Sequence, residues 1–140
     1  MNERRMQKDD LFILNTIAQT IFDKKGMNIL ALDVRNCSSM TDYVLIAEGN
    51  VDRHVIAIAS AVEAALKELG ISTAHEEGIK TGDWIVLDYM QIMVHIFIPG
   101  VREKYQLEEL WREAEIVDLS IDISSLRSAG YVGSRDTVSF

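Results

Sequence analysis

Apolar and polar positions alternate along residues 84–97, and this alternation predicts two antiparallel β-strands joined by a tight turn. A turn centred on Met90-Gln91 pairs Leu87 with Val94 across the two strands. One face of this hairpin then carries Ile85, Leu87, Tyr89, Ile92, Val94 and Ile96, and the other carries Trp84, Val86, Asp88, Met93, His95 and Phe97. The first face is apolar apart from one phenol, so we expect it in the core. The second face mixes aromatic rings with a carboxylate and an imidazole, so it is either covered by a helix or offered to a partner.

The rest of the chain shows helical and strand-like spacing in turn. Helices are predicted over residues 11–22, 53–69 and 105–115, and further strands over 27–34, 43–47 and 71–75. Asp52 stands where the N-cap of the second helix is expected. Together these elements predict an α/β fold, with a mixed β-sheet and flanking helices.

The C-terminal residues differ in composition from the rest of the chain. Residues 116–123 alternate well enough for a strand, but residues 124–140 are mostly small and polar. Such a segment has little apolar surface to bury, which is typical of mobile tails. We therefore expect one domain over residues 1–116. Residues 117–140 are expected to form a flexible C-terminal extension that is dispensable for folding.

Composition and charge restrict the setting and the partners. Apolar residues make up 48% of the chain and charged residues 26%, as in ordinary globular proteins. No apolar run approaches the ~18 residues that span a bilayer, and the single cysteine, Cys37, excludes an internal disulfide. We expect a cytoplasmic protein without membrane association. The net charge of −8 disfavours direct binding to DNA or RNA and favours a basic protein as partner.

Residues with catalytic or metal-binding spacing are missing from the sequence. The three histidines have none of the short spacings of metal sites, so we expect them to be structural or surface residues and predict neither a catalytic nor a metal site. Where Gly49 leads into the second helix, backbone N–H groups together with Asn50, Arg53 and His54 form a candidate anion site. Such a strand-loop-helix junction is common, and an ordinary helix cap is the better explanation of the same residues.

Trp84 is the strongest candidate for a contact with another protein. An aromatic anchor with polar groups around it is typical of an interface hot spot, and Asp88, Asp83 and Glu77 provide an acidic rim. The other interpretation is that Trp84 is packed beneath a helix as part of the core.

Several ordered strings closely resemble the ribosomal silencing factor family, also called RsfS or Iojap-like, over about residues 8–115. They are Leu32-Asp33-Val34, Ser38-Ser39-Met40-Thr41-Asp42-Tyr43, Gly49-Asn50-Val51-Asp52-Arg53-His54-Val55, Glu77-Gly78, Trp84-Ile85-Val86-Leu87-Asp88-Tyr89, Val94-His95-Ile96-Phe97 and Arg102-Glu103-Lys104-Tyr105-Gln106-Leu107-Glu108-Glu109-Leu110-Trp111. Each string alone carries little information, but their order and spacing are specific.

The resemblance implies a nucleotidyltransferase-like fold without enzymatic activity or cofactor. It implies binding to large-subunit ribosomal protein fourteen on the face of the large subunit that meets the small subunit, which blocks subunit joining and represses translation when nutrients are scarce. The family's partner-contacting tryptophan aligns with Trp84. We therefore expect the partner-binding surface to contain Trp84, Asp88, Tyr89, Asp83, Glu77 and Met90.

One departure from the family pattern lies at the hairpin turn. The family usually has Gly-Asp where this chain has Met90-Gln91, and neither residue favours positive φ, which predicts a looser or shifted turn.

Two other functions stay open. One is a nucleotide-processing enzyme, a nucleotidyltransferase on the same fold, with Asp33, Asp42 and Asp52 as metal ligands. The expected glycine loop is, however, followed by a single carboxylate, whereas two-metal phosphoryl transfer needs carboxylates for both ions. The other is a scaffold that forms a homodimer through the sheet or the final helix.

Overall fold

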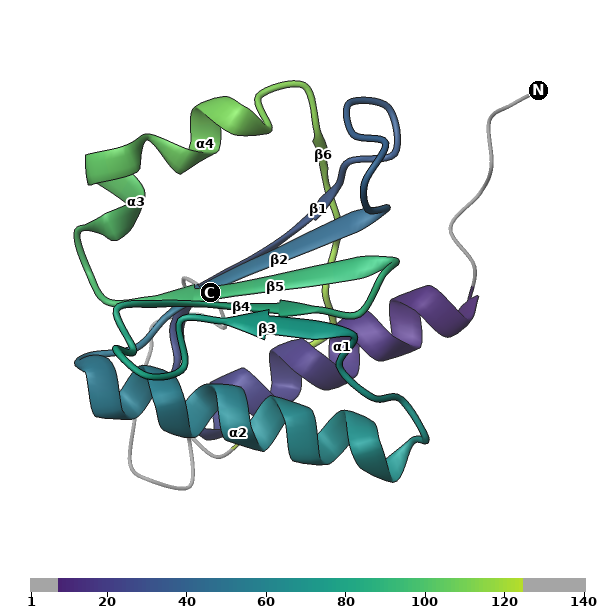
Figure 1. The fold of residues 1–140 in the computed structure, drawn as a ribbon. Helices are drawn as coiled ribbons and strands as arrows, with labels where there is room; N and C mark the ends of the chain where they lie inside the picture. The colour runs from purple at the N-terminus through teal and green to yellow at the C-terminus, as the bar shows by residue number, and fades with distance from the viewer. Residues whose placement is uncertain (1–7, 125–140) are drawn as a thin grey trace.

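A mixed β-sheet with helices on both faces forms the centre of the molecule (Figure 1), in a computed structural model that describes residues 8–124. The helices are α1 (Lys8–Asp23), α2 (Asp52–Glu68), α3 (Val101–Tyr105) and α4 (Leu107–Leu110), and the strands are β1 (Met27–Asp33), β2 (Tyr43–Glu48), β3 (His75–Glu77), β4 (Trp84–Asp88), β5 (Ile92–Phe97) and β6 (Glu115–Ile116). The strand order is β3-β4-β5-β2-β1-β6, with β2 and β5 parallel and the other neighbours antiparallel. The predicted α/β fold with a mixed sheet is confirmed. None of the helices within residues 8–124 is long and apolar enough to cross a membrane.

The hairpin of β4 and β5 has the register that its alternation predicts. Ile85 pairs with Ile96 and Leu87 with Val94. Their side chains have no exposed surface and lie in the larger of two cores, where α2 packs against both strands. We call this side of the sheet the main-core face. The opposite side is here called the aromatic face, and on the hairpin it carries Trp84, Val86, Asp88, Met93, His95 and Phe97.

The turn between β4 and β5 is neither looser nor shifted, so that prediction is wrong. The Tyr89 N–H donates to the Ile92 carbonyl oxygen at 2.9 Å, which keeps the two-residue turn. Met90 adopts φ 77°, a left-handed conformation in which a glycine would be unstrained. The Asp88 Oδ1 accepts a hydrogen bond of 2.8 Å from the Met90 N–H, which helps to hold this conformation.

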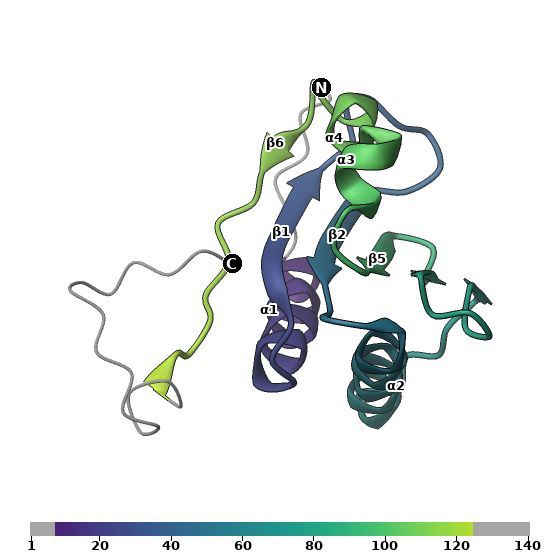
Figure 2. The ribbon, with the colours of Figure 1, turned by 90° about the vertical axis from the view of Figure 1, so that its left-hand side faces the viewer.

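A smaller core on the aromatic face lies beneath α3 and α4 (Figure 2). It contains Leu32, Val34, Val44, Ile46, Phe97 and Leu107. Arg102 anchors α3 to the sheet, because its guanidinium reaches the Asn28 carbonyl oxygen at 3.0 Å and the buried Glu48 carboxylate at 3.4 Å.

The prediction of a single helix over residues 105–115 is wrong. Helical structure starts at Val101 and is interrupted at Gln106, which has φ 50°.

Two other local predictions fail. The strand expected over residues 71–75 starts only at His75, because the Ile71 N–H is used to close the end of α2 on the Leu66 carbonyl oxygen at 2.9 Å. Asp52 is the first residue of α2 rather than its N-cap. The cap position belongs to Val51, which makes no side-chain cap hydrogen bond.

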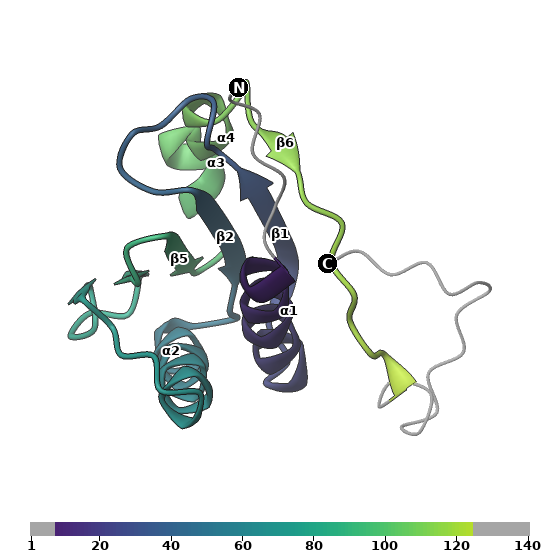
Figure 3. The same ribbon diagram turned by 90° about the vertical axis from the view of Figure 1, so that its right-hand side faces the viewer.

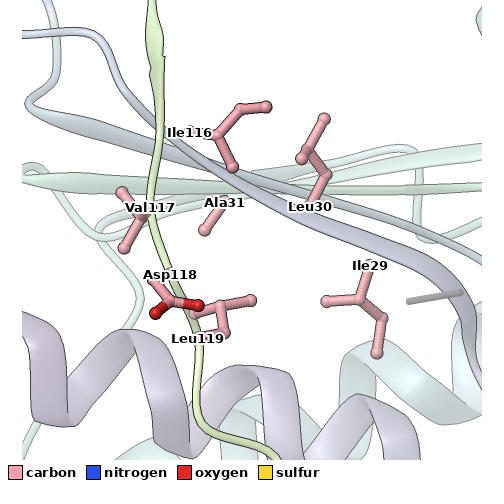
Figure 4. Close-up of a pocket in the computed structure, with 7 residues that line it drawn as sticks. All are labelled: Ile29, Leu30, Ala31, Ile116, Val117, Asp118 and Leu119. Atoms are coloured by element: carbon pink, nitrogen blue, oxygen red, sulfur yellow. The ribbon is translucent and has the colours of Figure 1, made fainter. Parts of the chain in front are cut away.

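Residues 117–124 run along the outer side of β1 and α1 (Figure 3). We call residues 117–122 the strap. The Val117 N–H donates to the Ala31 carbonyl oxygen at 2.8 Å, and Val117, Leu119 and Ile121 pack against the larger core. A cleft of about 330 Å³ stays open between the strap and β1 (Figure 4). Of the strand-like alternation at 116–123, only residue 116 belongs to a strand.

The proposed domain boundary after residue 116 stays a prediction. The contacts of the strap concern only residues 117–122 of the expected C-terminal extension. Residues 125–140 lie outside the described residues.

Candidate partner-binding surface

Trp84 lies at the border between the covered and the open parts of the aromatic face. Its ring is half-buried and meets Phe97 edge-on, with centroids 6.1 Å apart and planes at 86°. A second ring, Tyr105 at the end of α3, is tilted against it at 5.5 Å. The two interpretations of Trp84 therefore both hold in part: the indole is supported by α3, yet part of it is exposed.

His95 holds the polar end of the Trp84 indole. The Trp84 Nε1–H donates to the His95 Nδ1 at 3.1 Å. Because an indole N–H can only donate, this imidazole is neutral and carries its proton on Nε2. His95 is 8% exposed, its ring lies 5.5 Å from that of Trp111, and burial lowers its pKa to about 4.

The expected acidic rim lies partly on the same side of the sheet. Asp88 shares the aromatic face with Trp84, and the pairing of β3 with β4 brings His75 opposite Asp88 and Glu77 opposite Val86. The exposed His75 and Glu77 side chains are hydrogen-bonded, with 3.0 Å between the His75 Nε2 and the Glu77 Oε2. Sequence reasoning missed His75 as a member of this surface, since the strand was predicted to end there.

The loop before β4 fixes the other end of the rim. Asp83 is exposed, and its carbonyl oxygen accepts the Ile98 N–H at 3.0 Å. Gly78 has φ 84°, and a Cβ on it would lie 1.9 Å from the Trp84 carbonyl oxygen. Only a glycine allows the loop to pass this close to the backbone of Trp84.

Tyr89 and Met90 occupy different environments from Trp84. Tyr89 is 7% exposed and lies on the main-core face, where burial raises the pKa of its phenol. Its ring is therefore not available to a partner in the way that Trp84 is. Met90 is 65% exposed at the tip of the hairpin turn. The loop before β2 lies beside it, because the Asp42 N–H donates to the Gln91 carbonyl oxygen at 3.0 Å.

The candidate anion site at the start of α2 is largely satisfied from within the chain. The Asn50 N–H donates to the His54 Nδ1 at 2.8 Å, so the His54 Nε2 donates to the Lys24 carbonyl oxygen at 2.7 Å. The Arg53 N–H is bonded to the Asp52 carboxylate at 2.7 Å. These contacts favour the helix-cap interpretation, and His54 connects α2 to the end of α1.

The three aspartates of the enzyme hypothesis do not converge. The Asp33 carboxylate accepts two hydrogen bonds from the Arg35 guanidinium, at 3.0 and 2.7 Å, and one from the Arg35 backbone N–H at 3.1 Å. Asp33 pairs with Tyr43, so Asp33 and Asp42 lie at the start of β2, whereas Asp52 follows its other end. The six residues of β2 separate these positions by roughly 16 Å. Within residues 8–124 no three His, Cys, Asp or Glu side chains are placed to hold a metal ion.

Sequence reasoning missed the ring cluster as a unit. Tyr105 and Trp111 were expected on one continuous helix. A helix above Trp84 was the alternative interpretation, but the separate contacts of Tyr105 with Trp84 and of Trp111 with His95 were not predicted. Pro99-Gly100 followed directly by Val101 was the available signal, since a helix can start immediately after such a break.

The fold and this surface define a small α/β domain with a candidate protein-binding surface. The chain belongs to the ribosomal silencing factor family, because the model of the family described as "Ribosomal silencing factor during starvation" matches residues 7–136.

Individual relatives agree. The chain is similar to "Ribosomal silencing factor RsfS" of Bacillus subtilis, with 37% identity over 112 residues that cover 80% of this chain and 95% of the relative. The Haemophilus influenzae protein of the same name is 41% identical over 99 residues, 71% of this chain and 97% of the relative. A crystal structure of a Chromobacterium violaceum protein superposes with a TM-score of 0.71 at 29% identity, covering 84% and 95% of the two chains.

Proposed function

We propose that this protein binds large-subunit ribosomal protein fourteen on the large ribosomal subunit and thereby blocks joining of the small subunit, which represses translation in the cytoplasm. The observation that carries the proposal is the combination of family membership with a partly buried tryptophan beside an acidic rim. No bond is made or broken in this mechanism. Translation falls because one surface of the large subunit is occupied.

The charge of the chain supports a basic partner. Formal net charge is −8, and Asp83, Asp88 and Glu77 lie around Trp84 on two adjacent strands and the loop before them. Complementary charge speeds and orients the encounter, and a central aromatic side chain supplies most of the affinity. Reversing the charge of Asp83 or Glu77 should therefore slow association and change its dependence on salt.

The proposed role is that of a regulator rather than an enzyme. The separation of Asp33 and Asp42 from Asp52 along β2 supports this view, because two-metal phosphoryl transfer needs its carboxylates together. Transfer of labelled nucleotide that depends on Mg²⁺ and disappears in Asp52→Ala would overturn it.

The central test measures binding of the purified protein to isolated large subunits by sedimentation, and subunit joining by light scattering. Trp84→Ala should weaken binding by roughly 30- to 1,000-fold and relieve the block on joining. Phe12→Ala is the matched control, because Phe12 is an exposed ring on α1 (57% exposed) and should leave binding unchanged.

Melting curves separate contact from core. If Trp84→Ala binds as well as the parent, or if its loss of binding is accompanied by unfolding, the surface is wrongly assigned. If the parent protein itself does not sediment with large subunits, the proposed function is wrong.

A further inference from the structure

We propose that His95 is a positioning residue for the partner-binding surface: by accepting the indole N–H of Trp84 it fixes the ring in one orientation and leaves only carbon atoms of that ring for the partner. This inference rests on the proposed function. It concerns a residue that is itself buried, with its ring close to that of Trp111.

Trp84 makes one hydrogen bond, to His95, and its ring contacts three others, those of His95, Phe97 and Tyr105. The Nε1–H is directed at the His95 Nδ1 at 3.1 Å, while Phe97 and Tyr105 support the ring on other sides. Phe97 pairs with Trp84 across the hairpin, and His95 is its diagonal neighbour, within reach of a large side chain. Without an acceptor at His95, the ring contacts would still allow the indole to turn, since they are not directional toward its N–H.

His95 is itself held in place from above. Its ring lies 5.5 Å from Trp111, which follows α4, and its residue is 8% exposed. The acceptor is therefore fixed before any partner arrives. A tryptophan that is already ordered loses less conformational entropy on binding, and this preorganisation appears as affinity.

The consequence for recognition is that Trp84 does not offer its N–H to the partner. The indole N–H keeps its internal acceptor, because giving it up would leave the buried His95 Nδ1 unsatisfied. The partner group that meets Trp84 is then an apolar side chain or the flat face of a guanidinium, not a hydrogen-bond acceptor.

Two substitutions separate positioning from packing. His95→Phe fills the space but removes the acceptor, whereas His95→Asn leaves a small cavity but keeps an oxygen near the place of Nδ1. A purely structural role predicts that binding follows stability, so that His95→Phe binds better than His95→Asn. The positioning role predicts the opposite order.

Binding to large subunits, melting and exchange of the indole N–H are measured on the full chain. We expect His95→Phe to melt close to the parent, to exchange the Trp84 indole N–H faster by NMR, and to bind roughly 2- to 10-fold more weakly. His95→Asn should melt lower but retain slow exchange and bind as the parent does. In a Trp84→Phe background, where no N–H exists, His95→Phe should have no further effect on binding.

These measurements distinguish failure of the role of His95 from failure of the proposed function. A parent that binds large subunits while His95→Phe binds equally well overturns the role of His95 alone. Equal loss of binding in His95→Asn and His95→Phe, or fast indole exchange in the parent, also overturns it. A parent that does not bind large subunits overturns the proposed function, and the role of His95 falls with it.

Discussion

The main-core face and the aromatic face share the strands β2, β4 and β5, yet they are covered in different ways. The first lies under α1 and α2, of 16 and 17 residues, and its side chains on β5 are apolar and buried. The second lies under α3 and α4, of five and four residues, and it buries His95 and Glu48 among its apolar groups. Long amphipathic helices can seal a face with apolar contacts alone.

The short helices α3 and α4 do not seal the aromatic face in this way, so it keeps polar groups and a partly exposed ring at its border. We therefore expect stability and recognition to reside on opposite sides of one sheet. Stability is expected to come mainly from the main-core face, and recognition is proposed for the aromatic face.

The largest expected effect is the loss of stability when a side chain of the main-core face is truncated. Ile96→Ala removes a fully buried side chain of β5 and should cost about 4 kcal/mol of unfolding free energy. Met93→Ala is the matched variant on the aromatic face of the same strand, and since Met93 is half-buried it should cost about 1 kcal/mol. Urea unfolding of both variants measures the difference. Equal losses would contradict the division of roles between the faces.

A pH titration tests the aromatic face. Burial lowers the pKa of His95 from 6.5 to about 4, so the unfolded chain takes up a proton in this range before the folded protein does. The resulting contribution to the free energy of unfolding, about 3 kcal/mol, is fully present above about pH 6.5. It is lost as the pH falls toward 4.

The check is the unfolding free energy of the parent and of His95→Asn at several pH values between 7.5 and 4. Carboxylates titrate in both proteins, so only the difference reports on His95. The parent should lose its advantage as the pH falls. A constant difference across this range would show that His95 is not buried as a neutral imidazole.

The smallest effect concerns the strap. The Ser120 N–H donates to the Asn15 Oδ1 at 2.8 Å and the Asp122 N–H to the Gln19 Oε1 at 2.7 Å. Asn15→Ala or Gln19→Ala should each cost about 1 kcal/mol. Ser60→Ala, at an exposed position of α2, serves as the control and should cost less than either.

Melting of a chain that ends at Val117 addresses the prediction that the segment after it is dispensable for folding. A fall of several degrees contradicts that prediction and assigns a stabilising role to the strap. An unchanged melting temperature would confirm it and would show that the contacts of Leu119 and Ile121 contribute little.

The hairpin register could be predicted because alternation at period two specifies which residues face the core, and a slip by one residue would expose Ile85 and Leu87. The strand at 71–75 could not, because the Ile71 amide is claimed by the end of α2, a competition that local pattern does not reveal. The break at Gln106 escaped for a similar reason, since its neighbours have good helical spacing.

In the candidate site, too, the sequence predicted which face a residue lies on but not which side chains it contacts. Trp84 and Asp88 could be assigned to one face from spacing alone. The bond from Trp84 to His95 could not, since it depends on which rotamer each ring adopts under α3 and α4.

The hydrogen-bonding groups of α1 and of the strap repeat at slightly different distances along their axes. Asn15 and Gln19 are four residues apart on a helix, a rise of about 6.0 Å, while Ser120 and Asp122 are two residues apart in an extended chain, a rise of about 6.6 Å. The two repeat distances are nearly equal, so side-chain amides of a helix can accept hydrogen bonds from an extended backbone as a neighbouring strand would. Each step adds about 0.6 Å of mismatch, so such a ladder must be short. At Ser124 the backbone N–H has already turned to the carboxylate of Asp122 in its own segment, at 2.9 Å.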